Sequence, residues 1–199
     1  MKKMMFNDRY GLTEAVLAGR KTMTRRIVPD GTPLGNREET EKRSRFKVGE
    51  IVAVAQEYDV VFDEFASIVY AADFEGQVPD NFKAFGKESD STLSRKLPGW
   101  RNKMFVRADL MPHQIRITNV RVEKLKDISD EDCLREGIYK KTLCPPGDID
   151  YFYHSEPRSK LEVYPSPRDA FAGLIDKVSG KGTWQSNPWV YVYEFELVK

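Results

Sequence analysis

A lysine and a threonine lie three residues apart inside a cluster of arginines, in the stretch Gly19-Arg20-Lys21-Thr22-Met23-Thr24-Arg25-Arg26. A lysine with its usual pKa of about 10.4 is protonated at pH 7, but neighbouring positive charge disfavours the charged form and lowers that pKa. Such a lysine can accept the proton of a threonine hydroxyl, which is a weak nucleophile until a base activates it. Lys21 and Thr24 are therefore candidates for a base and its nucleophile.

The same residues also fit a plainer interpretation. Lysine and arginine on a turn are usually solvated, and ordinary surface ion networks perturb pKa values as active sites do. If Lys21 to Thr24 formed one strand, their odd spacing would send the two side chains to opposite faces. A shared site therefore requires a turn that runs at least through Lys21. The preceding residues 13–18 are typical of a short helix, which Gly19 is suited to end in the left-handed conformation.

A second short helix is predicted to carry a carboxyl group. Ser129 is a typical N-cap, the acidic residues after it suit a first helical turn, and Gly137 suits the end of the helix. Glu136 then lies in the last turn, where the negative end of the helix dipole favours the protonated form that a proton donor needs. The alternative is a surface glutamate that pairs with Arg135 or Lys140, because most acidic side chains are exposed.

Several blocks of the sequence resemble the ASCH domain family, whose members are related to the PUA-like RNA-binding barrels. Residues 18–26 resemble the family signature, and residues 115–125 with 128–137 resemble its central strand and the acidic helix that follows. Residues 187–195 are similar to its closing strand. With residues 46–51, these blocks total 45 of the 199 residues, and the resemblance is spread over about half of the chain.

This resemblance implies an activity. A compact bacterial branch of the family hydrolyses N(4)-acetylcytidine to cytidine, and its lysine, threonine and glutamate match Lys21, Thr24 and Glu136. The resemblance implies Lys21 as proton acceptor, Thr24 as nucleophile and Glu136 as proton donor, without a cofactor. Arg25 departs from the pattern, because the compact branch has an apolar residue there. Family membership alone does not fix the activity, since one fold hosts several functions.

The order of elements predicts an α+β fold, namely a PUA-like (ASCH) small β-barrel with short peripheral helices, formed by one domain over residues 1–199. Closure into a barrel removes the exposed edges of a flat sheet. Residues 30–45 mix both charges without apolar periodicity, which is typical of a mobile, solvated loop. Periodicity predicts helices near 12–18, 129–136 and 167–178, and strands at about 23–27, 50–56, 66–71, 104–107, 115–125 and 189–197.

Two insertions interrupt the family pattern, at about 57–103 and 139–164, and both are rich in aromatic side chains. Trp100 is the foremost candidate to stack on a base, because Pro98 and Gly99 place it on a turn. Aromatic residues in such segments more often belong to a core. Arg25 and Arg26 are the candidates for binding a carbonyl or phosphate oxygen of the substrate.

Composition limits the partners and the compartment. The 32 basic and 31 acidic residues give a net charge of +1, too small for the general attraction of a nonspecific nucleic-acid binder, although local patches remain possible. The sequence has no run of 18 apolar residues, and residues 1–9 lack the apolar region of an export signal. We therefore expect a cytoplasmic protein without membrane association. Cys133 and Cys144 lack the spacing of a zinc site, so we expect neither a metal nor a disulfide.

Together these patterns predict a protein that binds a nucleoside or an RNA base in a cleft between the Lys21 turn and the end of the Glu136 helix. As an enzyme it would be an amidohydrolase of N-acylated cytidine-type nucleosides. The alternatives are an RNA-binding module, with or without ribonuclease activity, and a protein that only recognises modified bases. Hydrolysis requires Lys21, Thr24 and Glu136 to converge within hydrogen-bond reach, whereas strand binding requires an open basic groove with exposed aromatic side chains. The sequence leaves the oligomeric state open.

Overall fold

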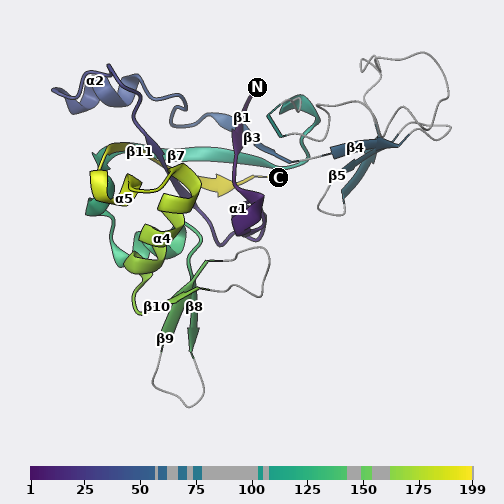
Figure 1. The fold of residues 1–199 in the computed structure, drawn as a ribbon. Helices are drawn as coiled ribbons and strands as arrows, with labels where there is room; N and C mark the ends of the chain where they lie inside the picture. Colours follow the sequence, from purple (N-terminus) through teal and green to yellow (C-terminus); the bar gives the residue numbers. More distant parts are fainter. Residues whose placement is uncertain are drawn as a thin grey trace. The chain divides into compact units, whose positions relative to one another are not determined.

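The computed structural model shows a chain of mixed α+β class, as the sequence predicts (Figure 1). It describes residues 1–56, 58–61, 67–70, 74–77, 103–104, 108–142, 149–153 and 162–198. The chain divides into two compact units, one drawn from residues 1–6 and 52–114 and the other from residues 7–51 and 115–198. The predicted catalytic residues all lie in the second unit.

The first unit contains a parallel strand pair, β1 (Lys2–Met5) with β3 (Ile51–Ala55). Four successive residues of β3, 52–55, are fully buried, as in a strand covered on both faces. Three further strands pair antiparallel in the order β4 (Tyr58–Val61), β5 (Ser67–Tyr70) and β6 (Phe74–Gln77). The strands predicted at 50–56 and 66–71 are confirmed by β3 and β5. Of the strand predicted at 104–107, Met104 lies in a turn and the other residues lie outside the described residues.

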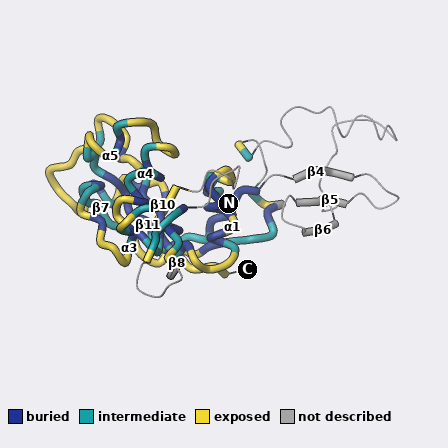
Figure 2. The backbone as a smooth tube through the Cα atoms, turned by 60° about the horizontal axis from the view of Figure 1, so that its bottom comes forward, coloured by how far each residue is buried: buried dark blue, intermediate teal, exposed yellow. Residues whose placement is uncertain are grey.

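The second unit is built around β11 (Trp189–Leu197), which pairs antiparallel with β2 (Met23–Ile27) on one side and with β7 (Gln114–Lys124) on the other (Figure 1). The bounds of β2 and β11 are those that the sequence predicts, and β7 begins and ends one residue earlier than expected. Residues 190–193 of β11 are all buried, and Figure 2 shows buried backbone through the region of β11. Other elements therefore cover both faces of β11 at its centre.

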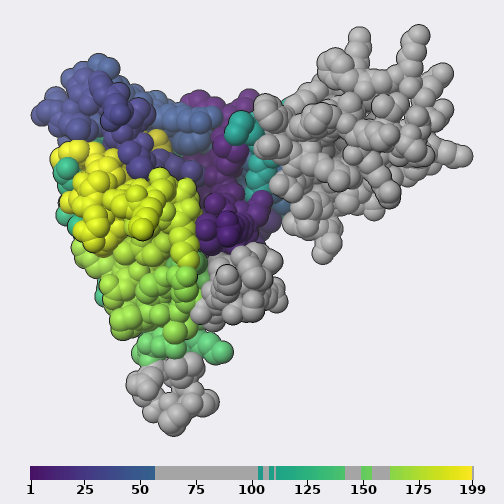
Figure 3. Space-filling view, viewed as in Figure 1, coloured from purple at the N-terminus to yellow at the C-terminus, as the bar shows by residue number. Residues whose placement is uncertain are grey.

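Short helices surround this sheet, and all except α5 lie close to where the sequence predicts them. They are α1 (Leu12–Leu17), α3 (Asp130–Arg135), α4 (Pro167–Ser179) and α5 (Thr183–Ser186), with single 3₁₀ turns at Asp8–Tyr10, Leu125–Asp127 and, in the first unit, Ala108–Leu110. The hydroxyl of Ser166 caps α4 by accepting a hydrogen bond from the backbone N–H of Asp169, and Phe171, Leu174 and Ile175 form its buried face. In Figure 3, α4 and α5 form one continuous surface.

A three-stranded antiparallel sheet lies within the predicted insertion at 139–164. Its strands are ordered β10 (Val163–Tyr164), β9 (Ile149–Phe152) and β8 (Tyr139–Thr142). Tyr139 stands opposite Phe152, and the two rings stack with centroids 5.1 Å apart. Such cross-strand aromatic pairs stabilise short antiparallel sheets.

The predicted barrel does not form from the described strands. In the part of the chain that the structure describes, strand neighbours follow one another in open rows, and no sheet closes on itself. The physical reason lies in how β11 is buried. Because other elements already cover both of its faces, the sheet buries its apolar side chains in layers and does not need to close to do so.

The prediction of a mobile loop over residues 30–45 is also corrected. This segment contains α2 (Arg37–Lys42), whose cap Asn36 accepts a hydrogen bond from the backbone N–H of Glu39. Ion pairs four residues apart, Arg37 with Glu41 and Glu39 with Arg43, stabilise the helix. The mixed charges that suggest a loop are therefore the pairs of a short solvated helix.

Candidate functional site

The turn that holds Lys21 begins where α1 ends. Gly19 adopts the left-handed conformation with φ of 70°, and the backbone N–H groups of Arg20 and Lys21 both donate to the carbonyl of Ala15 at 2.9 Å. The N–H of Thr22 donates to the carbonyl of Arg135 at 3.0 Å, which ties the turn to the end of α3. Lys21 therefore lies on a turn, as a shared site requires.

Glu136 directly follows the last residue of α3. The hydroxyl of Ser129 accepts a hydrogen bond from the backbone N–H of Asp132 and caps the helix, as the sequence predicts. Gly137 comes next, with φ of 103°, a conformation that side chains rarely adopt. A Cβ atom there would lie 3.4 Å from Leu12 Cδ2 and 3.6 Å from Lys21 Cδ. These are ordinary contact distances, so it is the left-handed backbone at the end of α3 that favours glycine here.

Lys21 and Glu136 form a buried ion pair. Lys21 Nζ donates to Glu136 Oε2 at 2.6 Å and to the Glu136 carbonyl oxygen at 2.7 Å, and the two side chains are only 2% and 5% exposed. Burial lowers the pKa of Lys21, against the opposing effect of Glu136, and the charges of Arg26 and Arg25 act in the same direction as burial. The pKa therefore moves as the sequence predicts, but burial is the larger cause.

Arg25 lies in an environment that the sequence does not predict. Its Nε and one terminal nitrogen donate to Glu123 Oε1 at 3.0 and 2.6 Å, and that terminal nitrogen also donates to Asp132 Oδ2 at 2.9 Å. The other terminal nitrogen donates to Glu136 Oε1 at 3.1 Å. The side chain is only 1% exposed. Its donors therefore bind protein carboxylates where sequence reasoning assigned them to a substrate oxygen.

These contacts belong to a larger ion network. Arg121 donates to Glu123 Oε2 at 3.0 Å, to Asp132 Oδ2 at 2.6 Å and to Glu194. Arg135 donates to Glu194 Oε2 at 2.8 Å and pairs with Asp132 Oδ1 at 3.4 Å. The network balances its charges and joins β2, β7, β11, α3 and the Lys21 turn; its members are Lys21, Arg25, Arg121, Arg135, Glu123, Asp132, Glu136 and Glu194.

Within the network, burial alone would raise the pKa of Glu194, but hydrogen bonds from Arg135 and Asn119 hold that pKa below its usual range.

The sequence did not predict most of this network. A signal for part of the network is present in β7, where Arg121 and Glu123 are two residues apart and therefore share one face of the strand. That pattern alone does not reveal which charges on other elements will meet them.

Thr24 lies on the other face of the sheet from Arg25. It pairs with Tyr193 in the β2–β11 ladder, whereas Arg25 pairs with Val192, and successive side chains of a strand alternate between faces. Thr24 is buried. Among the described residues, the hydrogen bonds of the Lys21 ammonium group go to Glu136, and none joins it to Thr24. Catalytic hydrogen bonds are often long or poorly aligned before a substrate binds.

The remaining candidate residues lie on the strand, in the core or outside the described residues. Arg26 shares the Thr24 face of β2, opposite Tyr191, and burial lowers its pKa. Trp100 lies outside the described residues, as does Cys144. Cys133 is buried, which raises the pKa of its thiol to about 12 and makes it a poor nucleophile at neutral pH. Within the described ranges, no cluster of three or more His, Cys, Asp or Glu side chains is arranged to hold a metal ion.

Comparisons of the chain with models of known protein families, with curated proteins and with solved structures found no match. The likeness to ASCH domains rests on the sequence blocks alone. Among the helices that the structure describes, none is long and apolar enough to span a bilayer.

Proposed function

We propose that this protein is an ASCH-type, PUA-like hydrolase that binds N-acylated cytidine-type nucleosides and releases the free amine. The observation that carries the proposal is the buried 2.6 Å contact between Lys21 Nζ and Glu136 Oε2, close in sequence to a buried threonine. A solvated surface lysine would keep its ordinary pKa, whereas burial lowers the pKa of Lys21. The pair thus has the properties of an acid and a base that act together.

In the proposed reaction, binding of the substrate brings the Thr24 hydroxyl within reach of neutral Lys21, which takes its proton, and the oxygen attacks the acyl carbon. The bond between the acyl carbon and the exocyclic nitrogen breaks, and Glu136 gives its proton to the leaving amine. Water then hydrolyses the threonine ester, which releases the carboxylic acid and restores Thr24. The sum is the addition of one water molecule across the amide bond.

The 2.6 Å hydrogen bond supports this division of roles. Moving one proton along it converts the ionised pair into neutral Lys21 and protonated Glu136, which are the base and the acid that the reaction needs. Burial lowers the pKa of Lys21 and so favours its neutral form, which is the base that the reaction needs.

Arg26 is the residue that we assign to the substrate carbonyl or phosphate oxygen. It lies two positions from Thr24 on the same strand, so both side chains project from the same face. Arg25 is committed to the ion network on the other face. The assignment of a substrate contact to Arg25 is therefore replaced by a role inside the protein.

RNA binding is the second candidate function, and one observation favours it. The Arg20 guanidinium lies 4.4 Å from the centre of the Tyr139 ring, which stacks on Phe152. Lys140 and Lys141 follow Tyr139 and are exposed. Aromatic and basic side chains in one place are typical of surfaces that bind single-stranded nucleic acid. In this case Arg20 and Phe152 would contact the RNA, and binding would weaken as salt rises.

The experiment is a hydrolysis assay on purified protein with a panel of N(4)-acylated cytidines, with a chelator present and cytidine release measured by chromatography. We expect release by the unchanged protein and a loss of at least about 10²-fold in Thr24→Val, which lacks the nucleophile. Thr22→Val is the matched control, because Thr22 lies in the same segment but only accepts a hydrogen bond from Arg135.

Two results would contradict the proposal. They are the absence of cytidine from every substrate in the panel, and full activity in the Thr24→Val protein. RNA binding that is lost in an Arg20→Ala, Phe152→Ala double variant, in a protein without hydrolysis, would make the RNA-binding module the better account.

A further inference from the structure

The two oxygens of the Glu136 carboxylate bind different cations. Oε2 accepts from Lys21 at 2.6 Å, and Oε1 accepts from Arg25 at 3.1 Å. A carboxylate alone with Lys21 could turn about its last side-chain bond and offer either oxygen. The contact from Arg25 removes that freedom.

Arg25 is itself held from the opposite side. Glu123 on β7 and Asp132 on α3 bind the rest of its guanidinium group, at 2.6 to 3.0 Å. A planar guanidinium group with fixed donors can hold several carboxylates in one arrangement, whereas an ammonium group is a single point of charge. Because these contacts fix the position of the Arg25 guanidinium group, Arg25 in turn fixes the orientation of the Glu136 carboxylate.

We propose that Arg25 is a positioning residue for the Lys21–Glu136 pair, directing Glu136 Oε2 at Lys21 and sharing the negative charge of the carboxylate. A role for Arg25 in catalysis rests on the proposed function, whereas its effect on the orientation of Glu136 and on the pKa of Lys21 does not. Among the described residues, the charges that act on Lys21 are those of Glu136, at the end of α3, and of Arg25 and Arg26 on β2. Without Arg25, the negative charge of Glu136 would act more fully on Lys21, which would then hold its proton more tightly.

Arg121 provides a matched control inside the same network. Like Arg25 it binds Glu123 and Asp132, but among the described residues it contacts neither Lys21 nor Glu136. Loss of either arginine removes one positive charge from the network and weakens the same two carboxylate contacts. Only loss of Arg25 changes the orientation of the Glu136 carboxylate and the negative charge that acts on Lys21.

The experiment measures the titration of Lys21 directly, by NMR of protein with ¹³C-labelled lysine, with the signal assigned by its absence from Lys21→Arg. In Arg25→Met we expect the midpoint to rise by about one pH unit, as on loss of a nearby like charge. In Arg121→Met the midpoint should stay where it is. Equal shifts in both variants, or no shift in Arg25→Met, would overturn the proposal, because a merely structural arginine would lower stability without moving this titration selectively.

Two further measurements keep the test decisive. If Arg25→Met does not fold, Arg25→Lys and Arg121→Lys are compared, because both keep the positive charge and remove the planar guanidinium group. A rise of the Lys21 midpoint confined to Arg25→Lys supports the positioning role. Equal midpoints in the two variants overturn it. In an active enzyme, the basic limb of kcat/KM against pH should follow the NMR midpoint in each variant. An unchanged protein with no hydrolysis would defeat the proposed function, whereas the titration decides the role of Arg25 separately.

Discussion

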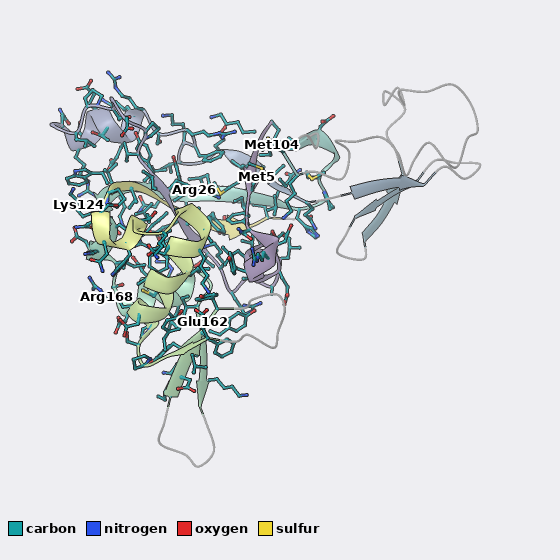
Figure 4. All side chains as sticks on the ribbon, viewed as in Figure 1. Met5, Arg26, Met104, Lys124, Glu162 and Arg168 are labelled. Atoms are coloured by element: carbon teal, nitrogen blue, oxygen red, sulfur yellow. The ribbon has the colours of Figure 1, made fainter. Side chains whose placement is uncertain are left out.

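The second unit contains two lysine–glutamate pairs with nearly the same contact distance and opposite surroundings. Lys21 and Glu136 are 2.6 Å apart and almost fully buried, whereas Lys177 and Glu162 are 2.5 Å apart with side chains 39% and 48% exposed. Figure 4 labels Glu162, near β10, and Arg26, the β2 residue whose charge acts on Lys21. The two pairs share the same chemistry and differ in their contact with water.

Their protonation follows from that difference. Burial lowers the pKa of Lys21, since removing an ammonium group from water disfavours its charge. At the exposed pair, hydrogen bonds from Lys177, Tyr164 and Tyr153 lower the pKa of Glu162 to about 2, so its carboxylate stays ionised. The contact distance therefore does not distinguish a reactive lysine–glutamate pair from a structural one, whereas the burial of the pair and its hydrogen-bond partners do.

The sharpest way to break this comparison is to replace the carboxyl group of each pair with an amide. Glu136→Gln keeps the size of the side chain and should lower turnover by about 10²–10⁴-fold, the usual loss for general acid catalysis. Glu162→Gln is the control and should leave turnover unchanged. The measurement is kcat with an N(4)-acylated cytidine.

A second variant tests whether the residues act as a unit. Combining Glu136→Gln with Lys21→Ala should cost little more than either change alone. Additive losses, or a fully active Glu136→Gln protein, would return Glu136 to a structural role.

Stability should separate the two pairs in the same direction. Glu136→Ala leaves Lys21 and Arg25 buried without one of their partners, and removal of one member of a buried pair typically costs about 3–5 kcal/mol. Glu162→Ala should cost less than about 1 kcal/mol, because exposed pairs are weak. Urea unfolding curves measure both values. Similar losses would show that burial does not distinguish the pairs energetically.

The glycine beside the buried pair should also be sensitive. Gly137→Ala forces a side chain into a conformation with φ of 103°, and the added Cβ would touch Leu12. We expect a loss of about 1–2 kcal/mol from the backbone strain. Gly35→Ala is the control, because nothing lies within 4 Å of the position and its φ is ordinary. Thermal unfolding of both variants checks the expectation, and an equal shift in melting temperature would argue against it.

The smallest effect concerns pH. The pKa of Glu162 is lowered on folding, so its pair contributes stability above about pH 4.5 and loses it as pH falls towards 2. Because both side chains are substantially exposed, the contribution should be below about 1 kcal/mol. Unfolding of the unchanged protein and of Glu162→Gln, compared at pH 3 and pH 6, measures it. A pH dependence that persists undiminished in Glu162→Gln would assign the effect to other carboxylates.

Lys21 makes stability change with pH in the same direction as Glu162, over a more basic range. Its pKa is lowered on folding, so this residue makes folding more favourable as pH rises from the lowered value towards 10.5. Turnover should fall over the basic limb, because a pair that has lost the Lys21 proton holds none for Glu136 to give to the leaving amine.

Local physics accounts for what the sequence predicts well. The bounds of β2 and β11 follow from β-branched, aromatic and alternating residues, and α3 and α4 follow from their caps at Ser129 and Ser166. Lys21 and Glu136 are found as a candidate pair through the resemblance to ASCH domains. The sequence also requires the turn at Gly19, which the structure confirms.

Only the tertiary structure decides the rest. Lys21 and Glu136 are 115 residues apart in sequence, and Arg25 is 98 residues from Glu123, so no local pattern reveals that these groups meet. Their burial, the ion network and the open sheet depend on how elements pack, and packing combines residues that are distant in the chain. Local preferences act over a few residues, whereas burial and charge pairing arise only when the whole chain has folded. The chemistry of Lys21 depends on its burial and on its pairing with Glu136.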